Sequence, residues 1–349
     1  MCARRYLALA ALAVTAACGG GGSGGGDAVR SQIRIVGSST VYPFATAVAE
    51  QFARASNGSF KAPVIEQNGT GAGLKLFCDG VGGKTPDIAN ASRRIKASEF
   101  EDCKKNGVNQ IIEIPIGIDG LALIESKNAQ AFPLTQADIY KALAANPYGK
   151  PNRALSWNQI NPALPSRPIL IFGPPPTSGT RDAFVELILT KGCESDPAMK
   201  ALKAKDEAKH RDLCTKIRED GVFVEAGEND NLLVQKVAGN PGAIGVMGYS
   251  FLEENLDKVR GIPLAGIAPS YASIANFSYP GSRPLFLYVK GEHLNVIPGI
   301  RQYIAAFASA WGDNGYLVRR GLIALPADQQ AAARAASTEL KPLDPATLT

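Results

Sequence analysis

Residues 33–44 read Ile-Arg-Ile-Val-Gly-Ser-Ser-Thr-Val-Tyr-Pro-Phe and form the unit that decides the fold. The run 33–36 has the β-branched residues of a short strand, and the polar turn 37–40 follows it. Apolar residues then recur at helical spacing, at positions 41, 44, 48 and 52. A strand, a polar turn and a helix in this order are typical of an α/β fold with largely parallel strands.

The same order recurs four more times along the chain. The further strands and their polar turns are 63–66 with 68–73, 87–91 with 92–94, 168–172 with 173–179, and 222–224 with 228–231. The first four turns of the chain are rich in glycine or hydroxyl residues, and two of them are flanked by arginine. The fifth turn, Glu228-Asn229-Asp230-Asn231, offers hydrogen-bond acceptors instead.

Two other apolar runs lack this polar turn and helix. They are 111–116, which continues through 121–124, and 285–289. Both suit the connections of a hinge between two lobes. We therefore expect residues 31–114 and 284–349 to form lobe I, and residues 115–283 to form lobe II.

The N-terminus has the order of an export signal. Two arginines precede a short apolar run, and two alanines precede Cys18, so residues 1–17 are predicted to be a signal peptide. Cys18 looks like the lipidated cysteine of a bacterial lipobox, and the glycine-rich residues 18–30 would form a flexible tether. We therefore expect a periplasmic lipoprotein anchored to a membrane by Cys18. The alternative is an ordinary cleaved signal peptide with an incidental cysteine.

Composition excludes several classes of protein. About 320 residues follow the tether, enough for two domains of ordinary size. The net charge of +5 is mild and no basic stripe is interleaved with aromatic residues, so we expect no nucleic-acid partner. No later segment is apolar for long enough to cross a bilayer.

Four cysteines remain beyond the export segment, and they allow three disulfide connectivities. We favour Cys78 with Cys103 and Cys193 with Cys214, because each pair is near in sequence and the pairs are far apart. Export makes disulfides plausible, whereas zinc sites usually contain a close Cys-x-x-Cys pair. We therefore expect neither a metal nor a cofactor.

The polar turns suit an anion. A helix N-terminus exposes unpaired backbone N–H groups and the positive end of its dipole. Taken singly, a serine or threonine there is more simply a helix cap. Together the turns bring hydroxyl groups from both lobes, with Thr40, Thr70 and Ser92 on one and residues 178–181 on the other. Arg93 and Arg181 are the candidates for charged, forked donors to a tetrahedral oxyanion.

Selecting phosphate over sulfate requires an acceptor as well, because phosphate keeps a proton near neutral pH. A buried carboxylate accepts that hydrogen bond and repels fully ionised sulfate. Asp230 is the first candidate and Asp182 the second. A simple helix cap is an equal explanation for Asp230.

At this point the motifs become recognisable. They are Gly37-Ser-Ser-Thr-Val-Tyr-Pro-Phe44, Gly69-Thr-Gly-Ala-Gly73, Asp87-Ile-Ala-Asn-Ala-Ser-Arg93 and Thr177-Ser-Gly-Thr-Arg181. In their order and spacing the chain resembles the phosphate-binding proteins of Pst ABC transporters. The resemblance implies a two-lobed periplasmic binding-protein fold (type II), with mixed sheets flanked by helices and two hinge strands. It implies a monomer that binds inorganic phosphate and delivers it to the membrane permease of an ABC importer. The ligand contacts it implies are Thr40, Val41, Thr70, Ser178, Gly179 and Thr180.

Two positions depart from the best-known branch of that family. An aspartate follows Ala-Ser there, where this chain has Arg93, and an arginine stands there at the place of Pro174. Another branch is similar to this chain in carrying Ser-Arg and a Glu-x-Asp-Asn stretch. The charges of the site are therefore rearranged.

Rival functions have less support. A secreted phosphatase or serine hydrolase using Ser178 would need a base, and the chain has only His210 and His293. No Gly-x-Ser-x-Gly, Walker or HExxH motif is present, so we expect no enzyme. A binding protein for arsenate or another oxyanion, with a sensing or secretion role, is the remaining alternative.

Overall fold

The computed structural model describes residues 30–227, 229–312 and 314–348. The expected signal peptide, Cys18 and the tether up to residue 29 lie outside the described residues. The strands are β1 Arg34–Gly37, β2 Val64–Gln67, β3 Ile88–Ala91, β4 Ile111–Ser126, β5 Ile171–Gly173, β6 Phe223–Glu225, β7 Ile244–Gly248, β8 Val259–Gly261 and β9 Ser282–Lys290. The main helices are α1 Tyr42–Ala55, α2 Thr70–Phe77, α3 Ala97–Lys105, α4 Gln136–Leu143, α5 Trp157–Ile160, α6 Gly179–Phe184, α7 Lys191–Cys193, α8 Pro197–Lys205, α9 Glu207–Thr215, α10 Asp230–Ala238, α11 Tyr249–Glu254, α12 Tyr271–Ala275, α13 Ile300–Ala310 and α14 Ala327–Glu339.

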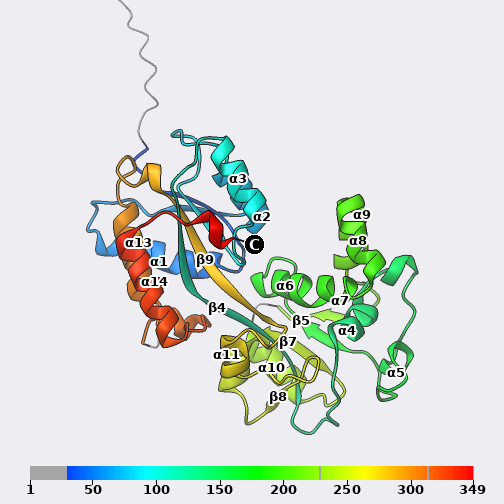
Figure 1. Ribbon diagram of the computed structural model, residues 1–349. Coiled ribbons are helices and arrows are strands. Elements are labelled where there is room, and N and C mark those ends of the chain that lie inside the picture. Colours follow the sequence, from blue (N-terminus) through cyan, green and yellow to red (C-terminus); the bar gives the residue numbers. More distant parts are fainter. Residues whose placement is uncertain (1–29, 228, 313, 349) are drawn as a thin grey trace, which may run out of the picture.

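The strands form two joined sheets, flanked by helices (Figure 1). One sheet has the order β2-β1-β3-β9-β4, and the other continues from β4 as β4-β7-β5-β6, with β8 also on β4. Pairs within β2-β1-β3 and β7-β5-β6 are parallel, and the pairs of β4 and β9 are antiparallel. This is a mixed α/β architecture with helices flanking the sheets, as the sequence predicted.

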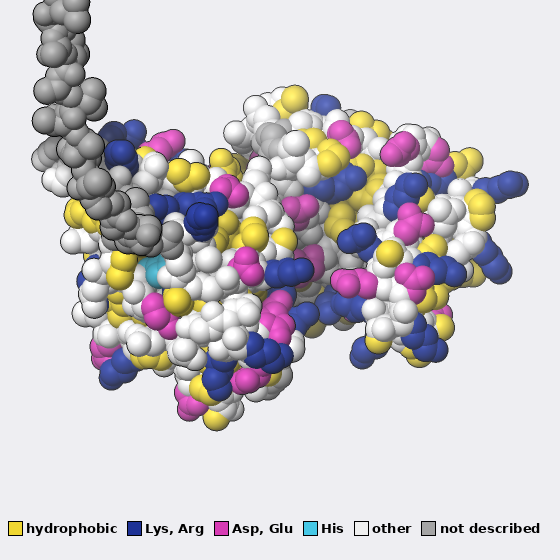
Figure 2. All heavy atoms as spheres, turned by 90° about the horizontal axis from the view of Figure 1, so that it is seen from above, with side chains coloured by type: hydrophobic (Ala, Val, Ile, Leu, Met, Phe, Trp, Pro, Cys, Tyr) yellow, Lys and Arg dark blue, Asp and Glu magenta, His cyan; other side chains and the backbone are white. Residues whose placement is uncertain are grey.

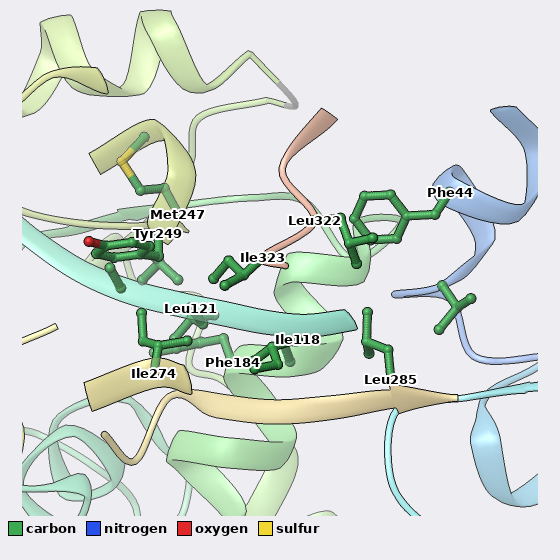
Figure 3. Packing of buried hydrophobic residues seen from close by; sticks show 14 of the residues in the cluster. Phe44, Ile118, Leu121, Phe184, Met247, Tyr249, Ile274, Leu285, Leu322 and Ile323 are labelled. Carbon is green, nitrogen blue, oxygen red and sulfur yellow. The ribbon is translucent and has the colours of Figure 1, made fainter. Parts of the chain in front are cut away.

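Of the two expected hinge runs, β4 is the strand that joins the two sheets, and β9 pairs with β3 and β4 in the first sheet. β4 is 16 residues long, and its first half pairs with β9 while its second half pairs with β7 and β8. The β4–β9 ladder has an irregularity between Pro115 and Gly117. Apolar side chains of β4, including Ile118 and Leu121, pack with residues of both lobes (Figure 3). One continuous core therefore supports both lobes and the hinge.

Parallel pairing brings the predicted turns together. Gly37 at the end of β1 is in register with Gln67 of β2 and Asn90 of β3, so three turns leave the same sheet edge side by side. Gly37 has a φ of +124°, and a Cβ there would lie 2.1 Å from the carbonyl oxygen of Asn90. Only glycine fits this close approach of β1 and β3. In the other sheet Gly173 of β5 is in register with Glu225 of β6.

Some predicted boundaries were wrong. The strand expected at 168–172 is confined to Ile171–Gly173, because Pro168 has no N–H to give and the N–H of Ile169 bonds instead to Leu155. The polar turn expected at 68–73 is shorter, because α2 begins at Thr70, after Gly69 with a φ of +79°. After α6 the helix continues with π geometry over Val185–Thr190.

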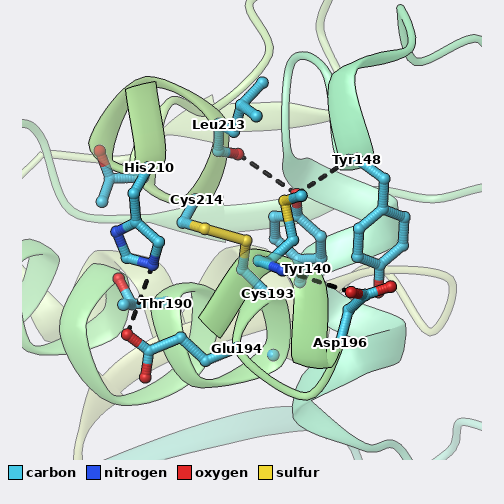
Figure 4. The surroundings of a disulfide bond; sticks show 12 residues. Tyr140, Tyr148, Thr190, Cys193, Glu194, Asp196, His210, Leu213 and Cys214 are labelled. Carbon is cyan, nitrogen blue, oxygen red and sulfur yellow. Dashed lines mark hydrogen bonds and ion pairs between the residues drawn. A yellow bond between two sulfur atoms is a disulfide. The ribbon is translucent and has the colours of Figure 1, made fainter. Parts of the chain in front are cut away.

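Both favoured disulfides are present in the structure, Cys78–Cys103 and Cys193–Cys214. The second lies beside Tyr140, whose hydroxyl donates to the carbonyl of Leu213 at 3.3 Å (Figure 4). That hydroxyl also accepts from the N–H of Tyr148 at 3.1 Å. The disulfide therefore ties α7 to α9 against α4. None of the helices in the described residues is long and apolar enough to cross a membrane.

Candidate functional site

A cavity of about 310 Å³ lies where the turns of the two lobes meet. Its walls are hydroxyl, glycine and charged residues: Ser38, Ser39, Thr40, Gly69, Thr70, Gly71, Ser92, Arg93, Asp182, Glu186 and Arg283. Figure 2 shows the molecule hollowed between its two halves, with basic and acidic side chains next to each other in the hollow. The cavity has the size and polarity for a small charged ligand rather than an apolar one.

The lobe I wall is preorganised by hydrogen bonds between neighbouring turns. The hydroxyl oxygens of Thr70 and Ser92 are 3.0 Å apart, and the backbone N–H of Ser92 donates to Thr70 Oγ1 at 3.0 Å. Ser92 and Thr40 are buried. These hydroxyl groups are fixed in place before any ligand arrives, which lowers the entropic cost of binding.

The two lobes touch at the mouth of the cavity. Ser39 Oγ donates to the carboxylate of Asp182, and Thr40 Oγ1 donates to the carbonyl of Gly179 at 3.4 Å. A Cβ on Gly179 would lie 2.9 Å from the carbonyl oxygen of Ser39 and 3.0 Å from Thr40 Cα. The first turn of α6 therefore packs against the β1–α1 turn, and glycine permits that contact.

Arg93 lines the cavity, and its guanidinium is already paired. Nη1 and Nη2 bond to the two carboxylate oxygens of Glu99 at 2.9 and 2.7 Å, and Nη1 also donates to the carbonyl of Arg94 at 3.1 Å. The hydrogen bonds to Glu99 raise the pKa of Arg93, although burial opposes them. The ion pair holds the charge at the edge of the cavity.

Arg181 is not among the residues that line the cavity. Its guanidinium stacks 4.4 Å above the centre of the Phe223 ring, and Nη1 donates to the carbonyl of Pro174 at 3.0 Å. Burial lowers the pKa of Arg181, an effect that Glu225 and Asp182 oppose. The side chain thus packs β5 and β6 against α6.

Three other predicted residues take local roles. Ser178 caps α6 by accepting from the N–H of Thr180 at 3.2 Å, and Val41 is fully buried before α1. Asp230 is the first residue of α10, and neither it nor Val41 is among the residues that line the cavity. The structure thus brings Thr40, Thr70, Ser92 and Arg93 to one cavity. Ser178, Gly179 and Thr180 are not among the lining residues, although Gly179 contacts Thr40, which is.

Sequence reasoning missed Arg283 and Glu186. Arg283 is in register with Asp119 across the β4–β9 ladder, and its Nε donates to Asp119 Oδ2 at 3.0 Å. Its Nη1 donates to Glu186 Oε2 at 2.7 Å. The sequence did contain one signal. An acidic residue, Asp119, interrupts one apolar hinge run, and a basic residue, Arg283, stands just before the other.

The two histidines serve other parts of the molecule. His210 Nε2 lies 3.4 Å from Glu194 near the second disulfide (Figure 4), and His293 Nδ1 lies 2.6 Å from Asp87. Neither residue lines the cavity. Among the described residues no group of three or more His, Cys, Asp and Glu side chains is placed to hold a metal.

Comparisons with known proteins agree with this geometry. A family model described as PBP superfamily domain matches residues 22–310. The protein SphX of Synechococcus elongatus is 32% identical over 88% of this chain and 81% of its own length. The phosphate-binding protein PstS of Staphylococcus epidermidis is 30% identical over 82% of this chain and 78% of its own. A crystal structure described as a possible phosphate binding protein from Planctomyces limnophilus superposes with a TM-score of 0.71 at 27% identity. That superposition covers 90% of this chain and 99% of the other.

Proposed function

Because the chain belongs to the PBP superfamily, and within it to the group of PstS and SphX, we propose that it binds inorganic phosphate outside the cytoplasmic membrane and delivers it to the permease of an ABC importer. The observation that carries this proposal is the cavity between the lobes, lined by hydroxyl groups and by Arg93 and Arg283. Hydroxyl and guanidinium donors converging from several turns suit a tetrahedral oxyanion. The chain acts by capture and release, as a monomer, with no chemical step.

The proposal is tested by titrating ligand-free protein with phosphate, arsenate and sulfate in a calorimeter. We expect phosphate to bind with a dissociation constant in the micromolar range or below, and sulfate to bind far more weakly. Arsenate has the same shape and protonation as phosphate, so only a direct comparison of their dissociation constants shows which of the two anions the protein prefers. Absence of phosphate binding would refute the proposed function.

The proton acceptor is best sought on α6. Asp182 lines the cavity and accepts a hydrogen bond from Ser39 across the lobe contact, which supports it over Asp230. A carboxylate there accepts the P–OH hydrogen bond and repels a fully ionised anion. Asp230 remains the alternative that the sequence favoured.

Asp182→Asn is therefore expected to relax selectivity. The ratio of the sulfate to the phosphate dissociation constant should fall by at least about 10-fold, because the amide no longer repels sulfate. Asp230→Asn is measured in parallel by the same titrations and should keep the wild-type ratio. A fall in the ratio with Asp230→Asn alone would assign the acceptor to Asp230.

The same proposal covers export and the division into lobes. Residues 1–17 would be removed as a signal peptide, and lipid on Cys18 would anchor the protein to the membrane on the periplasmic side. A mass increase on membrane-extracted protein that is absent after Cys18→Ala would support the anchor. Lobe I would comprise residues 31–114 and 284–349, and lobe II residues 115–283. The irregularity of the β4–β9 ladder between Pro115 and Gly117 supports a boundary there.

A further inference from the structure

Arg283 is a buried arginine that faces the candidate cavity from a hinge strand. Its side chain is 4% exposed, and it stands near the start of β9, where β9 pairs with β4. A buried cation is costly unless charges and hydrogen bonds satisfy it. Because Arg283 lines the polar cavity, any of its N–H groups that lacks a protein partner is available to a ligand there.

Arginine presents five N–H donors, and three of them have partners here. Nε donates to Asp119 on β4, Nη1 donates to Glu186 beyond α6, and Nη2 donates to Thr40 Oγ1 in the β1–α1 turn. One N–H on each terminal nitrogen has no partner among the described residues. With one N–H on each terminal nitrogen, an arginine can bind two oxygens of one oxyanion.

The other two arginines near the site are already committed. Arg93 has its fork closed on Glu99, and Arg181 is stacked on Phe223 with a hydrogen bond to Pro174. Pro174 itself cannot supply a charge. Arg93 and Arg283 both line the cavity, but among these three arginines only Arg283 bonds to residues of both lobes and of the other hinge strand.

We infer that Arg283 is an anion-binding residue of this site and that it couples the anion to closure of the lobes. Its two remaining N–H groups donate to oxygens of a tetrahedral oxyanion. Asp119 fixes the guanidinium on the hinge, while Thr40 and Glu186 meet it from opposite lobes, so a bound anion stabilises the arrangement in which both lobes reach Arg283. The inference rests on the proposed function, because it takes phosphate as the anion.

The test is the titration of Arg283→Met with inorganic phosphate. Loss of two charge-assisted hydrogen bonds is expected to raise the phosphate dissociation constant at least about 100-fold over wild type. The rise in melting temperature that 1 mM phosphate gives the wild-type protein should disappear as well, since this rise reports binding to the folded state. Circular dichroism of each variant checks that it is folded.

Arg218→Met is the matched control. Arg218 is also 4% exposed and paired with a carboxylate, that of Asp220, but it does not line the cavity. This variant should keep the wild-type phosphate dissociation constant even where its melting temperature falls. Arg283→Lys covers the case in which Arg283→Met does not fold: it keeps the charge without the fork, and we expect binding about 10-fold weaker.

The outcomes separate the inference from the proposed function. Wild-type binding together with wild-type affinity in Arg283→Met, or in Arg283→Lys where only that variant folds, would overturn the role of Arg283. Absence of binding by the wild-type protein would instead overturn the proposed function.

Discussion

Replacing Gly179 by valine is expected to weaken phosphate binding about 100-fold while leaving the ligand-free protein folded. A Cβ at this position would lie 2.9 Å from the carbonyl oxygen of Ser39 and 3.0 Å from Thr40 Cα, and both neighbours are backbone atoms. Extra methyl groups in a closely packed contact cost about 1–3 kcal/mol, and 3 kcal/mol corresponds to somewhat more than 100-fold in affinity. This free-energy cost applies to the closed state, in which α6 contacts the β1–α1 turn. Calorimetric titration with phosphate measures the change.

Gly71 provides the matched control for that experiment. It also lines the cavity, but a Cβ there would meet only Arg93 Nη2, at an ordinary contact distance of 3.7 Å. Gly71→Ala should therefore keep the dissociation constant within about 3-fold of the wild-type value. Gly179→Ala should fall between the two other variants. Equal affinities for Gly179→Val and Gly71→Ala would show that the contact of α6 with the β1–α1 turn has no part in binding.

The sequence allowed the placement of the site because its main features are local. A short apolar run, a turn of glycine and hydroxyl residues and a helical pattern identify the end of a strand without knowledge of its neighbours. Parallel pairing then brings those ends to one sheet edge, as the register of Gly37 with Gln67 and Asn90 confirms. The hinge strands were predictable for the complementary reason, since they are apolar runs without such a turn.

The partners of the charged side chains could not be predicted in the same way. Arg181 ends the motif Thr177-Ser-Gly-Thr-Arg181, yet its side chain stacks on Phe223, a residue of a strand 42 positions later in the chain. Arg283 lies 243 positions from its partner Thr40, and their contact depends on the pairing of β9 with β4. The partner of a long side chain depends on which residues the tertiary fold brings within its reach. Motif spacing therefore fixes backbone positions better than it fixes the direction of a guanidinium group.

A second large effect is expected in lobe I, where Asp87→Ala should lower the free energy of unfolding by about 4 kcal/mol. Asp87 is fully buried at the start of β3 and accepts hydrogen bonds from Arg30, from His293 and from the N–H of Arg34. Removing the carboxylate leaves these donors buried without their acceptor, which costs more than the pair itself contributes. Urea denaturation at pH 7 measures the loss.

The pH dependence of that loss identifies its cause. Burial alone would raise the pKa of Asp87, but the hydrogen bonds from His293 and Arg30 outweigh burial and lower the pKa below its ordinary value of 3.8. A lowered pKa in the folded state stabilises the protein above the unfolded pKa, and this contribution is lost as pH falls through the folded value. The gap between wild type and Asp87→Ala should thus be largest at pH 7 and narrower at pH 3. Asp102→Ala, which removes an exposed partner of Lys105 on α3, should leave the urea midpoint unchanged at both pH values. A gap of equal size at both pH values would mean that Asp87 stabilises the lobe by packing and not by its charge.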